Sequence, residues 1–293
     1  MSDFITTKAY AKVNLHLAVG KKATDGFHQI VSLFHKISLY DEIQIEVNKE
    51  AYSANIIVEM LGGPLVEQKD NLAYKAAALF YKNYQAVNSH TKGECKIKIV
   101  KNIPSGAGLG GGSSDAASVL MALNEIYNFP FSVGLLTQMA TTLGSDLPFF
   151  FCEEAALVTG KGEKVKAYKS KEKPYILLAF PNVSINTKKA YSWVDEDKAY
   201  LEELEPQKRF LCSLVDKQLV WDNSFFNSFE IPVSNRVAEV KKALELLRRY
   251  NPQSRLSGSG SVCFSLFESE LEMENVAKET KKAGLKIWQK KLL

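Results

Sequence analysis

The sequence lacks the features that mark membrane, secreted and metal-cage proteins. None of its apolar runs approaches the ~20 residues of a membrane span, and its first residues, MSDFITTKAYAKVNLHLAV, do not place a basic segment before an apolar core. Only four cysteines are present, widely separated, with no C-x-x-C or Cys/His cluster at metal spacing. These absences predict a cytoplasmic protein with reduced, mostly structural thiols and no metal site.

Strong charge of one sign is also missing. The formal net charge is +4 over 293 residues, whereas nucleic-acid binders usually carry a denser basic stripe. A mild positive excess suits an anionic small molecule, and a merely solvated surface accounts for it as well. The sequence therefore predicts no nucleic-acid and no membrane partner.

Length and composition indicate a two-domain globular protein. With 46% hydrophobic and 24% charged residues the chain can build ordinary cores, and 293 residues exceed the size of most single cores. The composition turns polar after Gly160. We therefore expect an N-terminal domain over residues 1–160 and a C-terminal domain over residues 161–293.

Apolar periodicity predicts an α+β fold. Apolar and polar residues alternate from Val13 to Val19, which indicates a half-buried strand with Lys12, Asn14 and His16 on the face opposite the core. Further strands are expected at residues 43–47, 56–60, 96–100, 175–180 and 262–267. Helical spacing predicts helices after Asn71, after the glycine run described below, from Ser132 to about residue 143, and around residues 210–215, 237–247 and 273–280.

The stretch PSGAGLGGGSSD, residues 104–115, holds five of the chain's 17 glycines and leads into a helical pattern. Glycine backbones can turn several N–H groups toward one point, and the start of a helix adds its positive end. The pattern favours a phosphate-binding loop, with Ser113 or Ser114 as the helix N-cap. The alternative is a flexible linker, although linkers seldom lead directly into an amphipathic helix.

Three common glycine motifs do not fit this run. G-x-G-x-x-G is present, but four residues separate it from the preceding strand and no acidic residue lies about 20 positions further on, as a dinucleotide site requires. No Gly-Lys-Ser/Thr triplet follows, which excludes a Walker A loop. The valine of the protein-kinase glycine loop is also absent.

The run resembles the P-x-x-x-G-L-G-S/G-S-S motif of the GHMP kinases, and the triple glycine before Ser-Ser narrows the resemblance to kinases of 4-diphosphocytidyl-2-C-methyl-D-erythritol. Four further segments agree in order and spacing: AKVNL (residues 11–15), DGFH (25–28), GSDLPFF (144–150) and LSGSGS (256–261), while PNVSINT (181–187) adds another. The match covers nearly the whole chain. It implies an N-terminal domain similar to the second domain of ribosomal protein S5 and a C-terminal ferredoxin-like domain.

The resemblance also implies a role for each matched residue. Asp146 is the expected general base for the accepting hydroxyl; flanking phenylalanines would raise its proton affinity. Lys12 is the expected neighbouring cation that offsets charge on the moving phosphate. The expected ATP-binding residues are Pro104, Ser105, Gly106, Ala107, Gly108, Leu109, Gly110, Gly111, Gly112, Ser113 and Ser114, with Mg²⁺ delivered by the nucleotide.

Substrate contacts are implied for four residues. Asn14 would position the hydroxyl, His28 would hydrogen-bond cytosine, and Phe27 and Tyr191 would stack on it. Phe27 stands where the family commonly has tyrosine. The implied reaction is ATP-dependent phosphorylation of the substrate's 2-hydroxyl by a monomer or weak homodimer; alternatives are a homoserine or mevalonate type of GHMP kinase, or a non-catalytic RNA-binding protein of the S5 fold.

Overall fold

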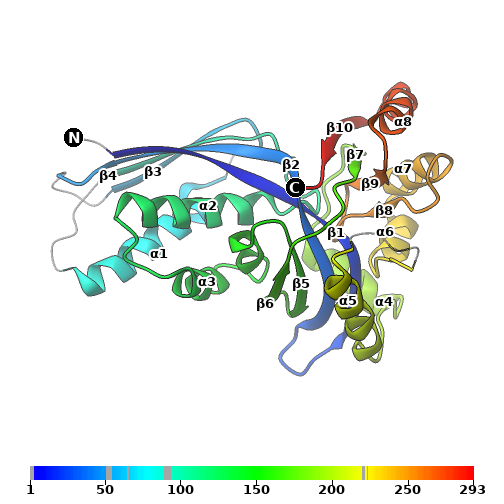
Figure 1. Cartoon of the computed structure of the whole chain (residues 1–293), viewed down its shortest axis with the longest axis horizontal. Helices are drawn as coiled ribbons and strands as arrows, with labels where there is room; N and C mark the ends of the chain where they lie inside the picture. Colours follow the sequence, from blue (N-terminus) through cyan, green and yellow to red (C-terminus); the bar gives the residue numbers. More distant parts are fainter. Residues whose placement is uncertain (1–2, 51–54, 65, 89–93, 220–221, 223) are drawn as a thin grey trace. The chain divides into compact units, whose positions relative to one another are not determined.

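The computed structural model describes residues 3–50, 55–64, 66–88, 94–219, 222 and 224–293 (Figure 1). The strands are β1 (Asp3–Lys22), β2 (His28–Asn48), β3 (Asn55–Leu61), β4 (Glu94–Val100), β5 (Ala155–Gly160), β6 (Lys164–Tyr168), β7 (Tyr175–Phe180), β8 (Arg255–Leu256), β9 (Cys263–Phe267) and β10 (Lys286–Lys291). The α-helices are α1 (Leu72–Val87), α2 (Gly111–Ile126), α3 (Val133–Thr141), α4 (Thr187–Glu196), α5 (Glu205–Lys217), α6 (Glu230–Arg236), α7 (Ala238–Arg248) and α8 (Glu270–Lys282); η1 (Gln68–Asp70) and η2 (Leu147–Phe151) are 3₁₀ helices.

The chain forms two compact units. Unit 1 comprises Met1–Ala11, Tyr40–Ser105 and Gly110–Phe151, and unit 2 comprises Lys12–Leu39, Gly106–Leu109 and Cys152–Leu293. Strands β1 and β2 and the glycine run therefore contribute residues to both. This division is discontinuous in sequence, whereas the expected boundary between residues 160 and 161 cuts the chain once, and that boundary stays a prediction.

Unit 1 is built around one apolar core. The C-terminal part of β2 pairs antiparallel with β4, and β4 pairs parallel with β3. Alternate residues of β4, Cys95, Ile97 and Ile99, are buried, as the period of two in a strand requires. They pack with the buried faces of α1, α2 and α3 in a single hydrophobic cluster.

Unit 2 contains a four-stranded antiparallel sheet in the order β10-β7-β9-β8 (Figure 1). Helices α4 to α7 lie between β7 and β8 in sequence, and α8 lies between β9 and β10. This β-α-β-β-α-β order is that of a ferredoxin-like domain, as expected. Outside it, Ile30–His35 of β2 pairs antiparallel with β5.

Strand β1 differs from the half-buried strand that its alternation predicts. In unit 2 both faces are covered, and Lys12, Asn14 and His16 are each less than 5% exposed. The segment around Phe226 pairs with β1 through the Leu17 N–H, which donates to the Phe226 carbonyl at 2.9 Å, and its Phe226 ring packs on His16 on the second face. A hydrogen-bonded polar side chain can occupy such a face, so alternation alone did not reveal the burial.

Two histidines in unit 2 are fully buried. His16 lies among aromatic rings, with the Phe226 ring centroid 4.6 Å away, and neither of its ring nitrogens has a hydrogen-bond partner among the described residues. His35 Nδ1 donates to the Lys36 carbonyl at 2.8 Å. Burial lowers the pKa of each ring to about 4, because the charged form loses its hydration.

Across the residues that the structure describes, no helix is both long enough and apolar enough to cross a membrane. His90, which the sequence predicts to be an ordinary surface histidine, lies outside the described residues.

These histidines predict a loss of stability in mild acid. Each stays neutral in the folded chain but takes up a proton near pH 6.5 when unfolded, so stability is present above pH 6.5 and is lost as the pH falls toward about 4. At pH 5 the loss is about 2 kcal/mol per histidine. We expect the free energy of unfolding, measured with urea, to fall less between pH 7 and pH 5 in His16→Leu than in wild type, because the variant lacks one of the two histidines. An equal decrease in wild type and variant would contradict this.

Candidate active site

Lys12 and Asn14 form a hydrogen-bonded pair on β1. Lys12 Nζ donates to Asn14 Oδ1 at 2.6 Å and lies 4.6 Å from the centroid of the Phe34 ring. Asn14 Nδ2 donates to Ser32 Oγ at 3.1 Å. A strand lysine usually reaches solvent, but this ammonium is held inside unit 2, where a fixed charge acts more strongly than in water.

The Gly106–Leu109 part of the glycine run is fixed to unit 2 by its backbone. Leu109 O accepts from the Lys12 N–H at 2.9 Å, and Ala107 O accepts from the Val262 N–H at 3.2 Å. Gly108 has φ +77°, and a Cβ atom there would lie 2.0 Å from the Ser257 carbonyl oxygen. Only glycine fits this conformation and this approach.

Ser257 connects the glycine run with β1. Its hydroxyl donates to the Gly108 carbonyl at 3.1 Å and accepts from the Asn14 N–H at 3.4 Å. Ser257 is fully buried. The loop of residues 257–261, which the sequence relates to the family's late glycine loop, therefore orders both Asn14 and Gly108.

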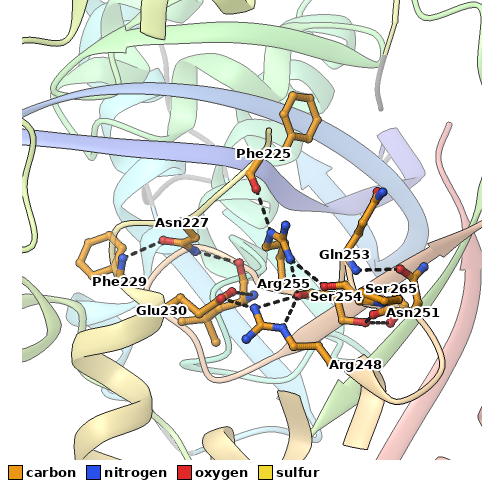
Figure 2. A network of polar contacts seen from close by, with 12 residues as sticks. Phe225, Asn227, Phe229, Glu230, Arg248, Asn251, Gln253, Ser254, Arg255 and Ser265 are labelled. Carbon is orange, nitrogen blue, oxygen red and sulfur yellow. Dashed lines mark hydrogen bonds and ion pairs between the residues drawn. The ribbon is translucent and has the colours of Figure 1, made fainter. Parts of the chain in front are cut away.

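A polar network holds the start of this loop (Figure 2). Asn227 Nδ2 donates to the carbonyls of Leu256 and Gly258, each at 2.8 Å. Glu230 accepts from the Leu256 N–H at 3.0 Å and pairs with Arg248. Buried polar groups in such networks fix one geometry when each has its partner.

The remaining part of the run begins α2 in unit 1. Gly110, at φ +71°, is the N-cap, and it has no side-chain capping bond. The expected N-cap role of Ser113 or Ser114 is therefore wrong: the left-handed glycine lets the helix begin earlier and places both serines in its first turn. Ser114 Oγ donates to the Tyr10 carbonyl at 2.7 Å.

This helix start suits an anion. The first N–H groups of an α-helix have no partner within the helix, and the dipole adds positive potential there. Gly111 and Gly112 carry no side chain over these groups. Ahead of the helix, Pro104 is half-buried and Ser105 is exposed.

Asp146 also lies in unit 1. It is half-buried, in a turn directly before η2, whose residues Leu147 to Phe150 are buried. The expected apolar surroundings of this part of the chain are therefore present. Its pairing with Lys12 stays a prediction.

His28 and Tyr191 lie together in unit 2. Their rings stack with centroids 5.0 Å apart and an interplanar angle of 21°. His28 Nδ1 donates to the Gly20 carbonyl at 2.8 Å, and Nε2 lies 3.3 Å from Asp195 Oδ1. Since a carbonyl only accepts, Nδ1 carries a proton, and Nε2 is the ring nitrogen that faces the Asp195 carboxylate.

Phe27 is separate from this stack. Phe27 is 58% exposed, and Lys161 Nζ lies 4.5 Å from the centroid of its ring. The aromatic face that a base could stack on is therefore accessible on the surface of unit 2.

Sequence reasoning did not predict two residues that contact the candidate site, Ser257 and Asp195. Ser257 was part of a matched segment, but only the structure shows its bonds to Gly108 and Asn14. Asp195 lies four positions after Tyr191, which puts both on one face of α4. With Tyr191 predicted as a site residue, this spacing could have indicated Asp195 as its neighbour.

Comparisons with known proteins show the family of this chain. The family model of the GHMP kinase N-terminal domain matches residues 71–154, and that of the GHMP kinase C-terminal domain matches residues 219–285. The fold is therefore that of a GHMP kinase, and the glycine run lies within the matched N-terminal segment. The expected two-domain α+β architecture is confirmed.

Within this class the similarity narrows further. The chain is 34% identical to "4-diphosphocytidyl-2-C-methyl-D-erythritol kinase" of Thermodesulfovibrio yellowstonii, over 94% of this chain and 93% of that protein. A crystal structure of 4-(cytidine 5'-diphospho)-2C-methyl-D-erythritol kinase is 31% identical, covers 98% of both chains and gives a TM-score of 0.78. The chain belongs to the 4-diphosphocytidyl-2-C-methyl-D-erythritol kinase family.

A mevalonate kinase from L. major solved with R-mevalonate shares the fold, with a TM-score of 0.70, 18% identity, and coverage of 100% of this chain and 98% of that one. At this identity the likeness concerns the fold alone.

The contact at Gly108 predicts a large difference between two glycine substitutions. Gly108→Ala should lower the free energy of unfolding by at least about 2 kcal/mol, because alanine is strained at positive φ and its Cβ would overlap a backbone oxygen. Gly112→Ala is the control: its Cβ would meet only Leu72 Cδ1 at 3.6 Å, and helical alanine should stabilise by about 0.5–1 kcal/mol. Equal urea midpoints for the two variants would contradict this account of Gly108.

Proposed function

We propose that this chain transfers the γ-phosphoryl group of ATP to the 2-hydroxyl of 4-diphosphocytidyl-2-C-methyl-D-erythritol, an intermediate of the non-mevalonate pathway to isoprenoid precursors. The observation that carries the proposal is the glycine loop, whose Gly106–Leu109 part is bound to the strand of Lys12 and Asn14. Membership of the family and the match of the AKVNL, DGFH and GSDLPFF segments support it.

The phosphates of ATP would rest on the amides of Gly106 to Ser114. Positive φ at Gly106, Gly108 and Gly110 lets successive N–H groups converge, and the start of α2 adds its positive end. Pro104 and Ser105 precede this cradle. Binding here needs no cationic P-loop lysine, because the main chain supplies the donors.

Mg²⁺ would arrive with the nucleotide and shield the charge on its phosphates. Among the described residues, no three His, Cys, Asp or Glu side chains gather as a metal site. Ser114 already donates to Tyr10, which leaves the half-buried Ser113 as the serine of the first turn best placed to contact the ion.

The transfer itself would use Asp146 and Lys12. Asp146 takes the proton of the 2-hydroxyl as the hydroxyl oxygen attacks the γ-phosphorus. The bond between the γ-phosphorus and the bridging oxygen of the β-phosphate breaks, which releases ADP. Lys12 offsets the negative charge that develops. Asn14 holds the ammonium through its Oδ1 and positions the hydroxyl.

The cytidine end would bind at His28. Its Nδ1 is occupied by Gly20, so Nε2, which faces Asp195, is the ring nitrogen that would hydrogen-bond the base, while Phe27 offers a stacking face. Tyr191 fixes the imidazole plane from one side. The absence of nucleic-acid and membrane partners, the cytoplasmic location and the monomeric or weakly dimeric state stay predictions.

An exchange of one carboxylate tests the chemistry. Asp146→Asn should lower kcat by ~10²-fold or more, the usual size of a general-base effect, and leave the KM for ATP nearly unchanged. Asp70→Asn, which makes the same change at a side chain 71% exposed, is the matched control and should retain wild-type turnover. A normal kcat in Asp146→Asn would remove Asp146 from the mechanism.

A panel of acceptors tests the substrate. ADP release, followed by a coupled assay, should depend on 4-diphosphocytidyl-methylerythritol, with kcat/KM at least ~10²-fold above mevalonate and homoserine, because a site built for hydrogen bonds rejects compounds that leave them unmade. Turnover with either rival acceptor alone would favour another GHMP kinase. Tight, strongly salt-dependent RNA binding without ATP turnover would favour the non-catalytic alternative.

A further inference from the structure

Unit 1 contains a buried charged triad that the proposed mechanism does not use. Lys101 Nζ pairs with Asp41 Oδ2 and, at 2.7 Å, with Asp115 Oδ2. The three side chains are 6%, 0% and 6% exposed. Lys101 is the residue after β4, Asp41 belongs to β2, and Asp115 lies in α2, directly after its first turn.

The triad joins the two ends of the glycine run. Lys101 and Asp115 lie 14 positions apart in sequence, on either side of the run. On the first side, Asp41 Oδ1 also accepts from the N–H groups of Asn102 at 2.5 Å and Ile103 at 2.8 Å. One ammonium and one carboxylate thus fix the backbone before Pro104 and the start of α2 together.

Gly111 adds to this link. A Cβ atom there would lie 3.0 Å from Ile103 Cγ2 and 3.5 Å from Lys101 Nζ. The first turn of α2 therefore lies directly against Lys101 and Ile103. Any movement of the ammonium would be passed on to the N–H groups at the helix start.

Stability alone does not account for three buried charges. Apolar residues of similar volume often stabilise a core as well as a buried ion pair or better, since burial removes the charges from water. Asp115 Oδ1 has no hydrogen-bond partner among the described residues. Burial raises the pKa of Asp115 against the attraction of Lys101, with Asp41 as the other charge that faces it. A fixed geometry, the better attested use of such groups, is what the phosphate loop needs.

We propose that Lys101, Asp41 and Asp115 are positioning residues that set the spacing of the phosphate-binding loop, with Lys101 as the shared centre. The inference rests on the proposed function, because it takes the loop as the ATP site. None of the three needs to touch the nucleotide. Loosening the triad should weaken ATP binding and affect the chemical step less.

Asp115→Ala tests this directly, because it leaves the neutral Lys101–Asp41 pair and removes only the link to α2. The dissociation constant of the Mg²⁺ complex of adenylyl imidodiphosphate, measured by calorimetry, should rise about tenfold, as expected when binding groups lose their alignment. The KM for ATP should rise equally, with kcat within about threefold of wild type.

Asn124→Ala is the matched control. Asn124 is buried at the other end of α2 and bonds the backbone of Phe131 through both Oδ1 and Nδ2, each at 3.0 Å. Its loss should destabilise the same helix without raising the nucleotide dissociation constant. A comparable rise in this control would mean that general destabilisation explains the effect, and would overturn the proposal.

Asp115→Asn keeps the shape and one acceptor for Lys101 but loses the charge, so its dissociation constant should rise about threefold, less than that of the alanine variant. If Asp115→Ala does not fold, a rise of about threefold or more in Asp115→Asn supports the proposal, and an unchanged dissociation constant overturns it. Wild-type affinity in a folded Asp115→Ala also overturns it. A wild-type chain that binds the nucleotide but does not phosphorylate the alcohol refutes the proposed function and leaves this comparison valid.

Discussion

The close contact between two backbones at Gly108 is the constraint on which the rest of the candidate site depends. The glycine run can meet the Ser257 carbonyl only where a Cβ is missing, and this approach lets one serine hydroxyl serve both Gly108 and Asn14. The glycine run and the strand that carries Lys12 are therefore held in place by the same serine. A loop rich in glycine would otherwise lose much entropy on binding phosphate; here the folded chain has already fixed part of it.

The same arrangement fixes the position of a buried positive charge, the Lys12 ammonium. Lys12 is buried but neither isolated nor mobile, since Asn14 Oδ1 and the Phe34 ring hold its ammonium. Phosphoryl transfer demands alignment and charge stabilisation more than covalent chemistry. In the proposed function, a preorganised cation and a set of amide donors held by the fold would supply both, because they need little rearrangement as the reaction proceeds. In unit 1 the Lys101 triad gives the ends of the loop a comparable rigidity.

Local signals predicted much of the fold. The apolar run at residues 175–180 is β7 as expected, and Ser132 caps α3 by accepting from the Leu135 N–H. The prediction of Ser113 or Ser114 as the N-cap of α2 was wrong, because Gly110, in the left-handed region, is the N-cap and replaces a side-chain cap. His16 was expected on an ordinary polar face; the segment that buries it lies some 200 residues away in sequence, beyond the reach of periodicity.

The site was predictable where chemistry and spacing coincide and not where it depends on distant contacts. The glycine run and the Lys12 strand carry motifs of their own, whereas Asp41 pairs with a lysine 60 positions away and nothing near it in sequence marks that role. The central claim is that the amides of Gly106 to Ser114 hold the triphosphate. Amide chemical shifts, recorded with and without the Mg²⁺ complex of adenylyl imidodiphosphate, test it most directly. The account predicts the largest changes at these amides; changes elsewhere that leave this run unmoved would contradict it.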